Sequence, residues 1–240
     1  MFKKIFCMTL MAMFAFGAQA QDDWTNFKRY HDDNEVVKTL PQDQRKVVFI
    51  GNSITDNWYS RHGAFFKENG YIGRGIGGQT TYQMVLRFYE DVVSLHPKAV
   101  VINGGTNDIA LNNHPYVEDR TFQNICTMAQ MAKQNKIKVI LTSITPCEKY
   151  GWRPEVKDAI QKIQSLNARI KEYAKKNKFQ YVDYYSAMVE VDNNGKVTGR
   201  MRPGISDKRN DGSDEGCHPN LAGYAIMEPL VQKAINKVAK

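Results

Sequence analysis

The chain has 240 residues, of which 42% are hydrophobic and 24% charged, and its formal net charge is +8. A chain of this length can form one domain with a full hydrophobic core. Its lysines are scattered along helical segments such as residues 171–178, and no dense basic run is interleaved with aromatic residues. We therefore expect no nucleic-acid partner.

The first twenty residues have the layout of a secretory signal peptide. Lys3 and Lys4 precede an apolar run at residues 5–16, and the small-residue sequence Ala-Gln-Ala follows at residues 18–20. The run is shorter than the ~20 residues that span a bilayer, which argues against a membrane anchor. We expect cleavage after residue 20, which lowers the net charge from +8 to +6. The remaining domain, residues 21–240, is then secreted or periplasmic, without stable membrane insertion.

Short apolar runs alternate with longer amphipathic segments along the rest of the chain. Strands rich in β-branched residues are predicted at residues 47–50, 71–76, 99–102, 138–142 and 179–182. Helices are predicted at residues 80–93, 116–135, 154–177 and 221–238. This alternation indicates βαβ units, and therefore a five-stranded parallel sheet sandwiched between helices.

Small polar residues and glycines follow several of the predicted strands. These segments are GNSITD at residues 51–56, GGQTT at 77–81 and NGGTND at 103–108. An irregular stretch at residues 192–220 ends in SDEGCHPN, just before the last helix. In a parallel α/β sheet the ligand site lies outside the carboxyl ends of the strands, so we expect these segments to form the functional site.

A serine and a histidine in these segments have the pattern of a nucleophile and its general base. Ser53 directly follows the first strand, near the positive end of the next helix, although a serine there also suits a helix N-cap. Glu215 lies three residues before His218. A carboxylate at that spacing can orient the imidazole, which then takes a proton from the serine hydroxyl. Asp214 is the substitute candidate for the orienting acid.

Ester hydrolysis also requires donors for the oxyanion of the tetrahedral intermediate. Gly78 can supply a main-chain N–H, Asn107 its side-chain amide and Ser53 its own main-chain N–H. The alternative is structural, because a glycine also suits a tight turn and an asparagine a helix cap.

Together these segments resemble the four signature blocks of the GDSL or SGNH hydrolase family. The blocks are GNSIT around Ser53, the glycine loop with Gly78, GGTND with Asn107 and EGCHPN with His218. They occur in the order and spacing of that family, and the resemblance covers residues 47–223.

The resemblance implies a flavodoxin-like three-layer α/β/α fold and hydrolysis of carboxylic esters through an acyl-enzyme, without a metal or other cofactor. It implies the roles of nucleophile, oxyanion-hole donors and base for the four residues named in the blocks. Two positions depart from the family pattern. Asn52 stands where an aspartate usually precedes the nucleophile, and Glu215 stands where an aspartate usually precedes the histidine.

A glycine pattern and two tryptophans lie close to the segments of the predicted site. Gly73, Gly75 and Gly78 form a G-x-G-x-x-G pattern, but no acidic residue ends the next strand, so we do not expect a dinucleotide site. Trp58 and Trp152 fall near the predicted site, where they are candidates for substrate contact or for ordinary packing.

Basic residues and cysteines give weaker indications. Arg202 lies on the approach to the histidine block and is a candidate for contact with an acidic substrate, although such charges more often solvate a loop.

Cys126, Cys147 and Cys217 remain after signal cleavage. This odd number argues against a disulfide framework; at most one bridge is possible, and we expect none.

The preferred function is removal of acetyl groups from a carbohydrate, because exported family members with such short loops resemble carbohydrate acetylesterases. The alternatives are a lysophospholipase or thioesterase, and a catalytically silent glycan-binding module on the same fold. The expected partner is thus a small-molecule or glycan ester. The sequence does not determine the oligomeric state.

Overall fold

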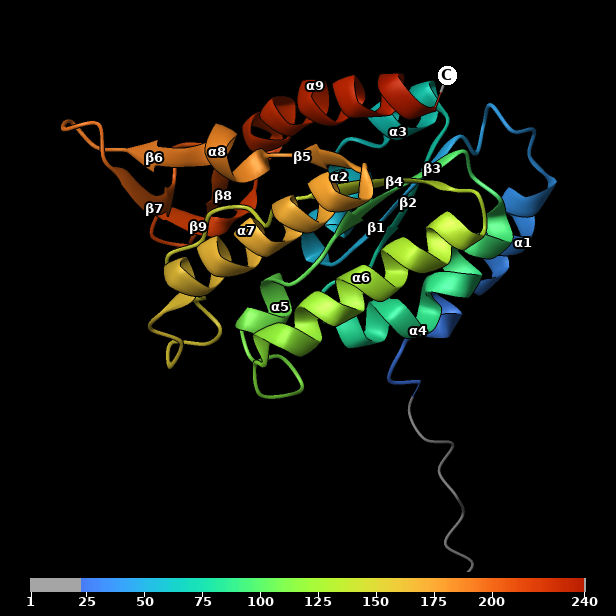
Figure 1. Ribbon diagram of the computed structural model, residues 1–240. Helices are drawn as coiled ribbons and strands as arrows, with labels where there is room; N and C mark the ends of the chain where they lie inside the picture. Colours follow the sequence, from blue (N-terminus) through green and yellow to red (C-terminus); the bar gives the residue numbers. More distant parts are fainter. Residues whose placement is uncertain (1–22, 240) are drawn as a thin grey trace, which may run out of the picture.

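Five parallel strands form the central sheet, in the order β2-β1-β3-β4-β5 (Figure 1). The computed structural model describes residues 23–239, so the expected signal peptide lies outside the described residues. The strands are β1 (Val47–Gly51), β2 (Tyr71–Gly75), β3 (Ala99–Asn103), β4 (Lys138–Thr142) and β5 (Gln180–Val182). This strand order is that of flavodoxin-like folds. The predicted fold class is therefore confirmed.

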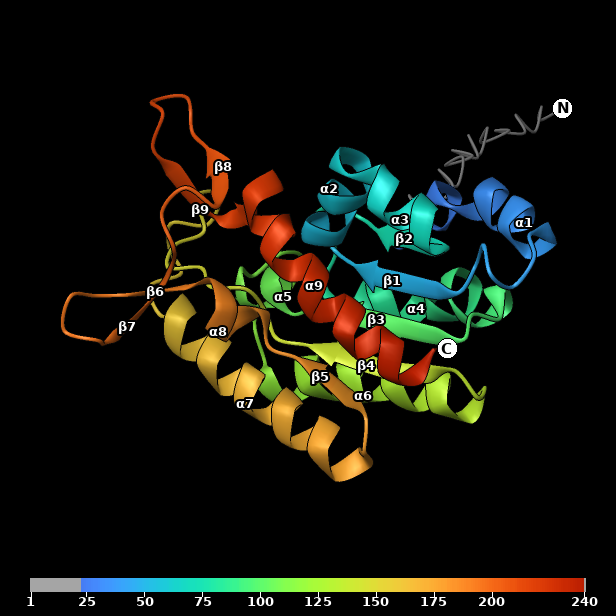
Figure 2. The same cartoon turned by 90° about the horizontal axis from the view of Figure 1, so that it is seen from above.

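Helices cover both faces of the sheet and make a three-layer sandwich (Figures 1 and 2). One face carries α1 (His31–Thr39), α4 (Thr81–Asp91), α6 (Glu118–Gln134) and α7 (Ala159–Asn177). The other face carries α2 (Ser53–Arg61), α3 (Gly63–Asn69), α8 (Tyr184–Met188) and α9 (Leu221–Val238). The remaining helical elements that the structure describes are short: η1 (Phe27–Arg29), η2 (Val93–Leu95) and α5 (Thr106–Ile109).

Alternating side chains of β1 explain why both faces need a helical layer. Val48 and Ile50 pack with α4 and α6, whereas Val47 and Phe49 pack with α2, α3 and α9. Successive side chains of a strand point to opposite faces. A strand that is apolar at every position therefore requires cover on both sides.

The predicted strands agree with the structure to within one residue, but several other regions differ from the sequence-based interpretation. The helix predicted at 154–177 begins only at Ala159. The helix α1, at residues 31–39, was not among the predicted helices. The stretch at 192–220, expected to be irregular, contributes to two antiparallel hairpins (Figure 2). These are β6 (Val189–Val191) with β7 (Val197–Met201), and β8 (Ser206–Lys208) with β9 (Asp214–Pro219).

The helices that the structure describes lie within residues 23–239. Within this described part of the chain, none combines the length and the apolar character needed to cross a bilayer.

Candidate active site

Ser53 is the first residue of α2, at the carboxyl end of the central strand β1. The N-cap of this helix is the buried Asn52, whose side-chain oxygen accepts a hydrogen bond from the main-chain N–H of Ile54 at 3.1 Å. The amide nitrogen of Asn52 has no hydrogen-bond partner among the described residues. Because Asn52 caps the helix, the Ser53 hydroxyl is not needed as a cap and can face the histidine.

His218, at the end of β9, lies against both Ser53 and Glu215. The Ser53 Oγ is 2.9 Å from the His218 Nε2, and the His218 Nδ1 is 3.2 Å from the Glu215 Oε1. The other carboxylate oxygen of Glu215 accepts the main-chain N–H groups of Cys217 at 2.8 Å and of His218 at 2.7 Å. All three side chains are half-buried. This arrangement fixes the imidazole between a hydroxyl and a carboxylate.

Hydrogen bonding keeps the Glu215 carboxyl ionised. Burial by itself would raise the pKa of this carboxyl. The hydrogen bonds from the His218 side chain and from the main-chain N–H groups of His218 and Cys217 outweigh burial, and its pKa lies below the ordinary value. The group beside the imidazole is therefore an anion at neutral pH, which favours a proton on the His218 Nδ1.

Asp214 is directed elsewhere. Its carboxylate forms an ion pair with Lys208 at 2.6 Å and accepts the main-chain N–H of Gly204 at 2.8 Å. The bond from Lys208, together with that from Gly204, lowers the pKa of Asp214. Of the two candidate acids, Glu215 is the one in contact with His218.

Gly78 lies in the loop between β2 and α4. Its φ of 77° is in the left-handed region, which glycine adopts without the strain that a side chain would cause. Asp56 of α2 holds this loop, because its carboxylate accepts the main-chain N–H of Gly77 at 3.1 Å. The N–H groups of the glycine loop are thereby fixed relative to the helix that begins at Ser53.

Asn107, the second residue of α5, reaches the same loop from the end of β3. Its side chain is buried, and its amide nitrogen donates to the main-chain carbonyl of Gln79 at 2.9 Å. An amide group has two N–H donors, so one remains for an oxyanion. The next residue, Asp108, holds the start of α4: its carboxylate accepts hydrogen bonds from the Thr81 N–H at 2.9 Å and from the Thr81 hydroxyl at 2.6 Å. Burial raises the pKa of this carboxyl.

The Asn107→Ala variant should lose about 10² to 10³-fold in kcat for para-nitrophenyl acetate, with a smaller change in KM. The reason is that an oxyanion donor acts mainly in the transition state. Steady-state kinetics measures this split. The matched control is Asn167→Ala, because the buried Asn167 also bonds main chain, at Ile144. The control should unfold more easily but keep kcat within about tenfold of the original. Equal losses of kcat in both variants would contradict the assigned role of Asn107.

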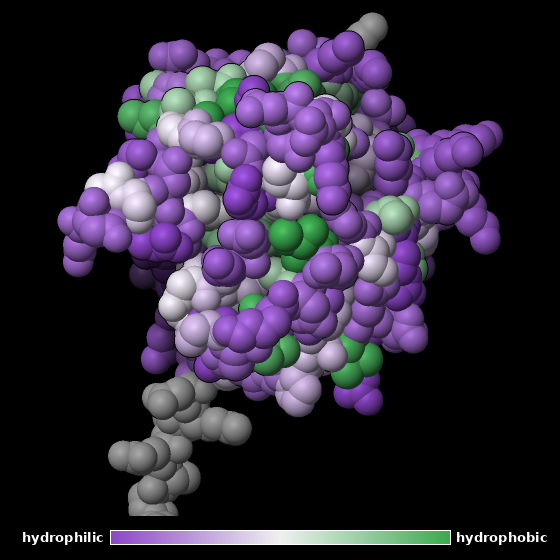
Figure 3. Space-filling model, turned by 90° about the vertical axis from the view of Figure 1, so that its left-hand side faces the viewer, coloured by the Kyte–Doolittle hydropathy of each residue, from purple (hydrophilic) through white to green (hydrophobic). Residues whose placement is uncertain are grey.

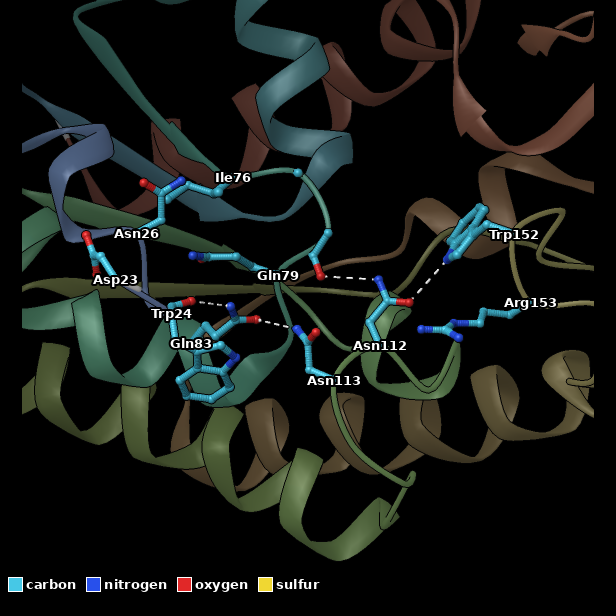
Figure 4. Close-up of a pocket in the computed structure, with 12 residues that line it drawn as sticks. Asp23, Trp24, Asn26, Ile76, Gln79, Gln83, Asn112, Asn113, Trp152 and Arg153 are labelled. Atoms are coloured by element: carbon cyan, nitrogen blue, oxygen red, sulfur yellow. Dashed lines mark hydrogen bonds between the residues drawn. The ribbon is translucent and has the colours of Figure 1, made fainter. Parts of the chain in front are cut away.

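A pocket of about 570 Å³ adjoins the glycine loop (Figure 4). On one side Trp152 lies with its ring 5.4 Å from that of His218. The Trp152 indole N–H donates to the side-chain oxygen of Asn112 at 3.2 Å, and the Asn112 amide donates to the main-chain carbonyl of Gly78 at 3.2 Å. Trp152 and Gly78 are thus linked along the pocket wall, and the Trp152 ring lies beside His218.

The structure contradicts the candidate role of Trp58. This side chain is only 2% exposed and stacks on Phe65 and Tyr224 within the core. Its indole N–H donates to Glu228 at 3.1 Å. Its place in the sequence, close after Ser53, suggested the rim of the site, but on α2 the side chain points inward, toward α9.

Arg202 does not line the pocket beside Gly78. It is exposed, at the end of the hairpin formed by β6 and β7. Two neighbouring basic groups are already paired, Arg200 with Glu190 at 2.6 Å and Lys208 with Asp214 at 2.6 Å. The surroundings of Arg202 therefore give no support for recognition of an acidic substrate.

A disulfide joins Cys147 to Cys217, so the expectation of no disulfide is wrong. The two Cα atoms are 4.7 Å apart, within the range of protein disulfides. Cys147 lies in the loop after β4 that carries Trp152, and Cys217 precedes His218. The bond thus ties the Trp152 loop to the His218 loop. Counting cysteines missed it because the partners are 70 residues apart and meet only in the fold.

Replacing both bridging cysteines by serine should lower the free energy of unfolding by about 2 to 4 kcal/mol, or roughly 5 to 15 °C in Tm. It should also reduce activity, because the loops beside His218 would no longer be tied together. Thermal unfolding with and without reductant measures the first effect. Cys126, half-buried and outside the disulfide, provides the control Cys126→Ser, which should respond to reductant like the original protein. If reductant left the Tm of the original protein unchanged, the bond would not stabilise the fold.

The pocket wall includes residues that sequence reasoning did not single out. Trp24, Gln83 and Asn112 are among them. Asn112 follows the NGGTND segment closely, and that proximity is the only sequence signal for it. Trp24 is an aromatic residue in a polar stretch far from every motif, and nothing in the sequence connects it with Gly78.

A flavodoxin-like sheet with a serine, a histidine and a carboxylate in contact at its carboxyl edge is the arrangement of a serine hydrolase. The sequence profile of the GDSL-like lipase/acylhydrolase family matches residues 49–226. The chain belongs to this family, and it is a hydrolase of the esterase type.

Solved structures agree with this assignment. The chain is similar to a Bacteroides fragilis protein described as an acylhydrolase, with 50% identity and a TM-score of 0.82 over 91% of this chain and 99% of that one. It is also similar to a GDSL-like lipase from Bacteroides thetaiotaomicron, with 52% identity and a TM-score of 0.78 over 89% of this chain and 98% of that one.

Two further proteins are similar at a lower sequence identity or over a smaller share of the chain. An acetylxylan esterase from Geobacillus stearothermophilus shares the fold at 20% identity, with a TM-score of 0.55 over 80% of this chain and 94% of that one. The Bacillus subtilis lipoprotein YqeF is 37% identical over 78 residues. That match covers 31% of this chain, and the chain spans only 32% of the lipoprotein's length.

Proposed function

We propose that this protein is an exported serine esterase that removes acetyl groups from carbohydrates. The observation that carries the proposal is the polar character of the pocket beside Gly78. Seven of its twelve lining residues have charged or amide side chains: Asp23, Asn26, Gln79, Gln83, Asn112, Asn113 and Arg153. Gln79 and Gln83 are buried and bonded within the protein, but the other five groups are exposed or half-buried. These five can bond the hydroxyls of a sugar, whereas a long acyl chain requires apolar walls.

The molecular surface supports the same substrate class. The face that carries the loops after β3 and β5 is largely hydrophilic, with only small apolar patches (Figure 3). Proteins that act on lipids usually expose a larger contiguous apolar patch. An acetylated carbohydrate therefore suits this face better than a lysophospholipid.

In the proposed mechanism, His218 takes the proton of the Ser53 hydroxyl as the serine oxygen attacks the acetyl carbonyl. The main-chain N–H groups of Ser53 and Gly78 and the Asn107 amide stabilise the oxyanion. His218 then gives the proton to the leaving sugar oxygen, and an acetyl-enzyme remains. Water attacks this ester with His218 again as base, which releases acetate and restores Ser53. Glu215 orients the imidazole throughout.

Export is supported by two independent features. The layout of residues 1–20 predicts a signal peptide, which leaves a single domain from residue 21 to residue 240. The disulfide between Cys147 and Cys217 requires an oxidising compartment to persist, as found outside the bacterial cytoplasm.

Hydrolysis of a series of para-nitrophenyl esters and of acetylated xylo-oligosaccharides by the purified protein tests the proposal. We expect release of acetate from the oligosaccharides and a sharp fall in kcat/KM beyond butyrate. A preference for long acyl chains would instead indicate the lysophospholipase or thioesterase alternative. Failure of a serine-directed phosphonate to label the protein would indicate a silent glycan-binding module.

A further inference from the structure

The segment just before α1 is fastened to the glycine loop by its main chain. The Gln79 side-chain amide donates to the carbonyl of Thr25 at 2.7 Å, and the Gln83 amide donates to the carbonyl of Trp24 at 2.6 Å. The hydroxyl of Tyr30 donates to the carbonyl of Gly75. The segment is therefore a fixed wall beside the proposed oxyanion donors.

The Trp24 side chain takes no part in the bonds that fasten this segment, and it lines the pocket. Its main chain carries the bond to Gln83, while its indole is 49% exposed and lines the pocket. An exposed indole in a pocket wall presents a flat apolar face and an N–H donor to a ligand. In Figure 4 the indole lies at one side of the pocket, and Trp152 lies at the other.

Between the two indoles the wall is formed by amides. Asn113 donates to the Gln83 side-chain oxygen at 3.2 Å, and Asn112 bridges Gly78 and Trp152. The charged groups of the lining are one of each sign, Asp23 and Arg153. The aromatic faces of the indoles suit the apolar faces of sugar rings, and the amides suit their hydroxyl groups. The charged groups of the lining balance, which suits uncharged sugars.

We propose that Trp24 is the stacking platform of a second sugar subsite, so that the substrate is an acetylated oligosaccharide of uncharged sugars. The inference rests on the proposed function. Trp152 lies beside His218 and therefore contacts the ring that carries the acetyl ester. Trp24 lies at the far side of the pocket and contacts a neighbouring ring of the same chain.

Kinetics of the Trp24→Ala variant with two substrates test this subsite. We expect kcat/KM for acetylated xylotetraose to fall about tenfold more than kcat/KM for para-nitrophenyl acetate, because only the oligosaccharide reaches the indole. The Trp24→Tyr variant should recover most of the loss. Phe27→Ala is the matched control, since Phe27 is a 40% exposed aromatic of the same segment outside this pocket. It should leave the ratio of the two kcat/KM values unchanged.

The possible outcomes separate the two proposals. If the original protein deacetylates xylotetraose but Trp24→Ala affects both substrates equally, the subsite is wrong and the proposed function stands. If the original protein deacetylates no oligosaccharide, the proposed function fails. In that case, calorimetric titration of the Ser53→Ala variant with unmodified xylotetraose tests whether the subsite binds an oligosaccharide. Binding that is lost in the variant carrying both Ser53→Ala and Trp24→Ala would support it, and absence of binding would overturn it.

Discussion

Ser53→Ala is expected to lower kcat for para-nitrophenyl acetate by at least about 10⁴-fold. The Ser53 Oγ is the oxygen that lies 2.9 Å from the His218 Nε2, and removing it leaves the imidazole without a nucleophile to activate. The residual rate should come from binding and from the oxyanion donors alone.

The fold of this variant should be intact, which makes the result interpretable. Asn52 caps α2, so the helix does not depend on the Ser53 hydroxyl. Circular dichroism and thermal unfolding should therefore match the original protein. A matched hydroxyl on the same helix is Ser60, which is exposed and donates only to the carbonyl of Asn57. Ser60→Ala should keep full activity, and retention of more than about a tenth of the activity by Ser53→Ala would refute the mechanism.

Glu215→Gln is expected to reduce kcat by about 10² to 10⁴-fold, the upper value being that known for the equivalent change in a serine protease triad. The main-chain N–H groups of Cys217 and His218 hold one side-chain oxygen. They would keep the glutamine oxygen in that place and direct its NH₂ group toward the His218 Nδ1. An NH₂ donor there selects the tautomer with the proton on Nε2, which cannot accept the serine proton.

Asp214→Asn is the matched control for this experiment. It removes a carboxylate one residue away that pairs with Lys208 and has no contact with the imidazole among those the structure shows. We expect activity within about threefold of the original, because the lost ion pair is partly exposed. Kinetics of the two variants side by side give the answer. A larger loss in Asp214→Asn than in Glu215→Gln would transfer the orienting role to Asp214.

The sequence by itself determined the central sheet and the edge at which the candidate site forms. Each predicted strand, such as residues 138–142, is a short apolar run, and its burial on both faces is a local property of those residues. The same holds for the placement of Ser53, Gly78 and Asn107 after successive strands. Because parallel strands end at one edge, their positions after strands were enough to place these residues at the same edge of the sheet.

Only the tertiary structure decided which carboxylate contacts the histidine and which tryptophan meets the pocket. The three-residue spacing favoured Glu215 but left Asp214 open, and the alternation of a regular strand would have placed Asp214 on the side of His218. The backbone of β9 departs from that alternation at Gly216, whose φ is 86°, and the Glu215 carboxylate accepts the N–H groups of Cys217 and His218. Trp58 is buried by α9, a helix more than 150 residues away, while Trp24 reaches the glycine loop through bonds from Gln79 and Gln83. These contacts join distant segments, and packing rather than local pattern determines them.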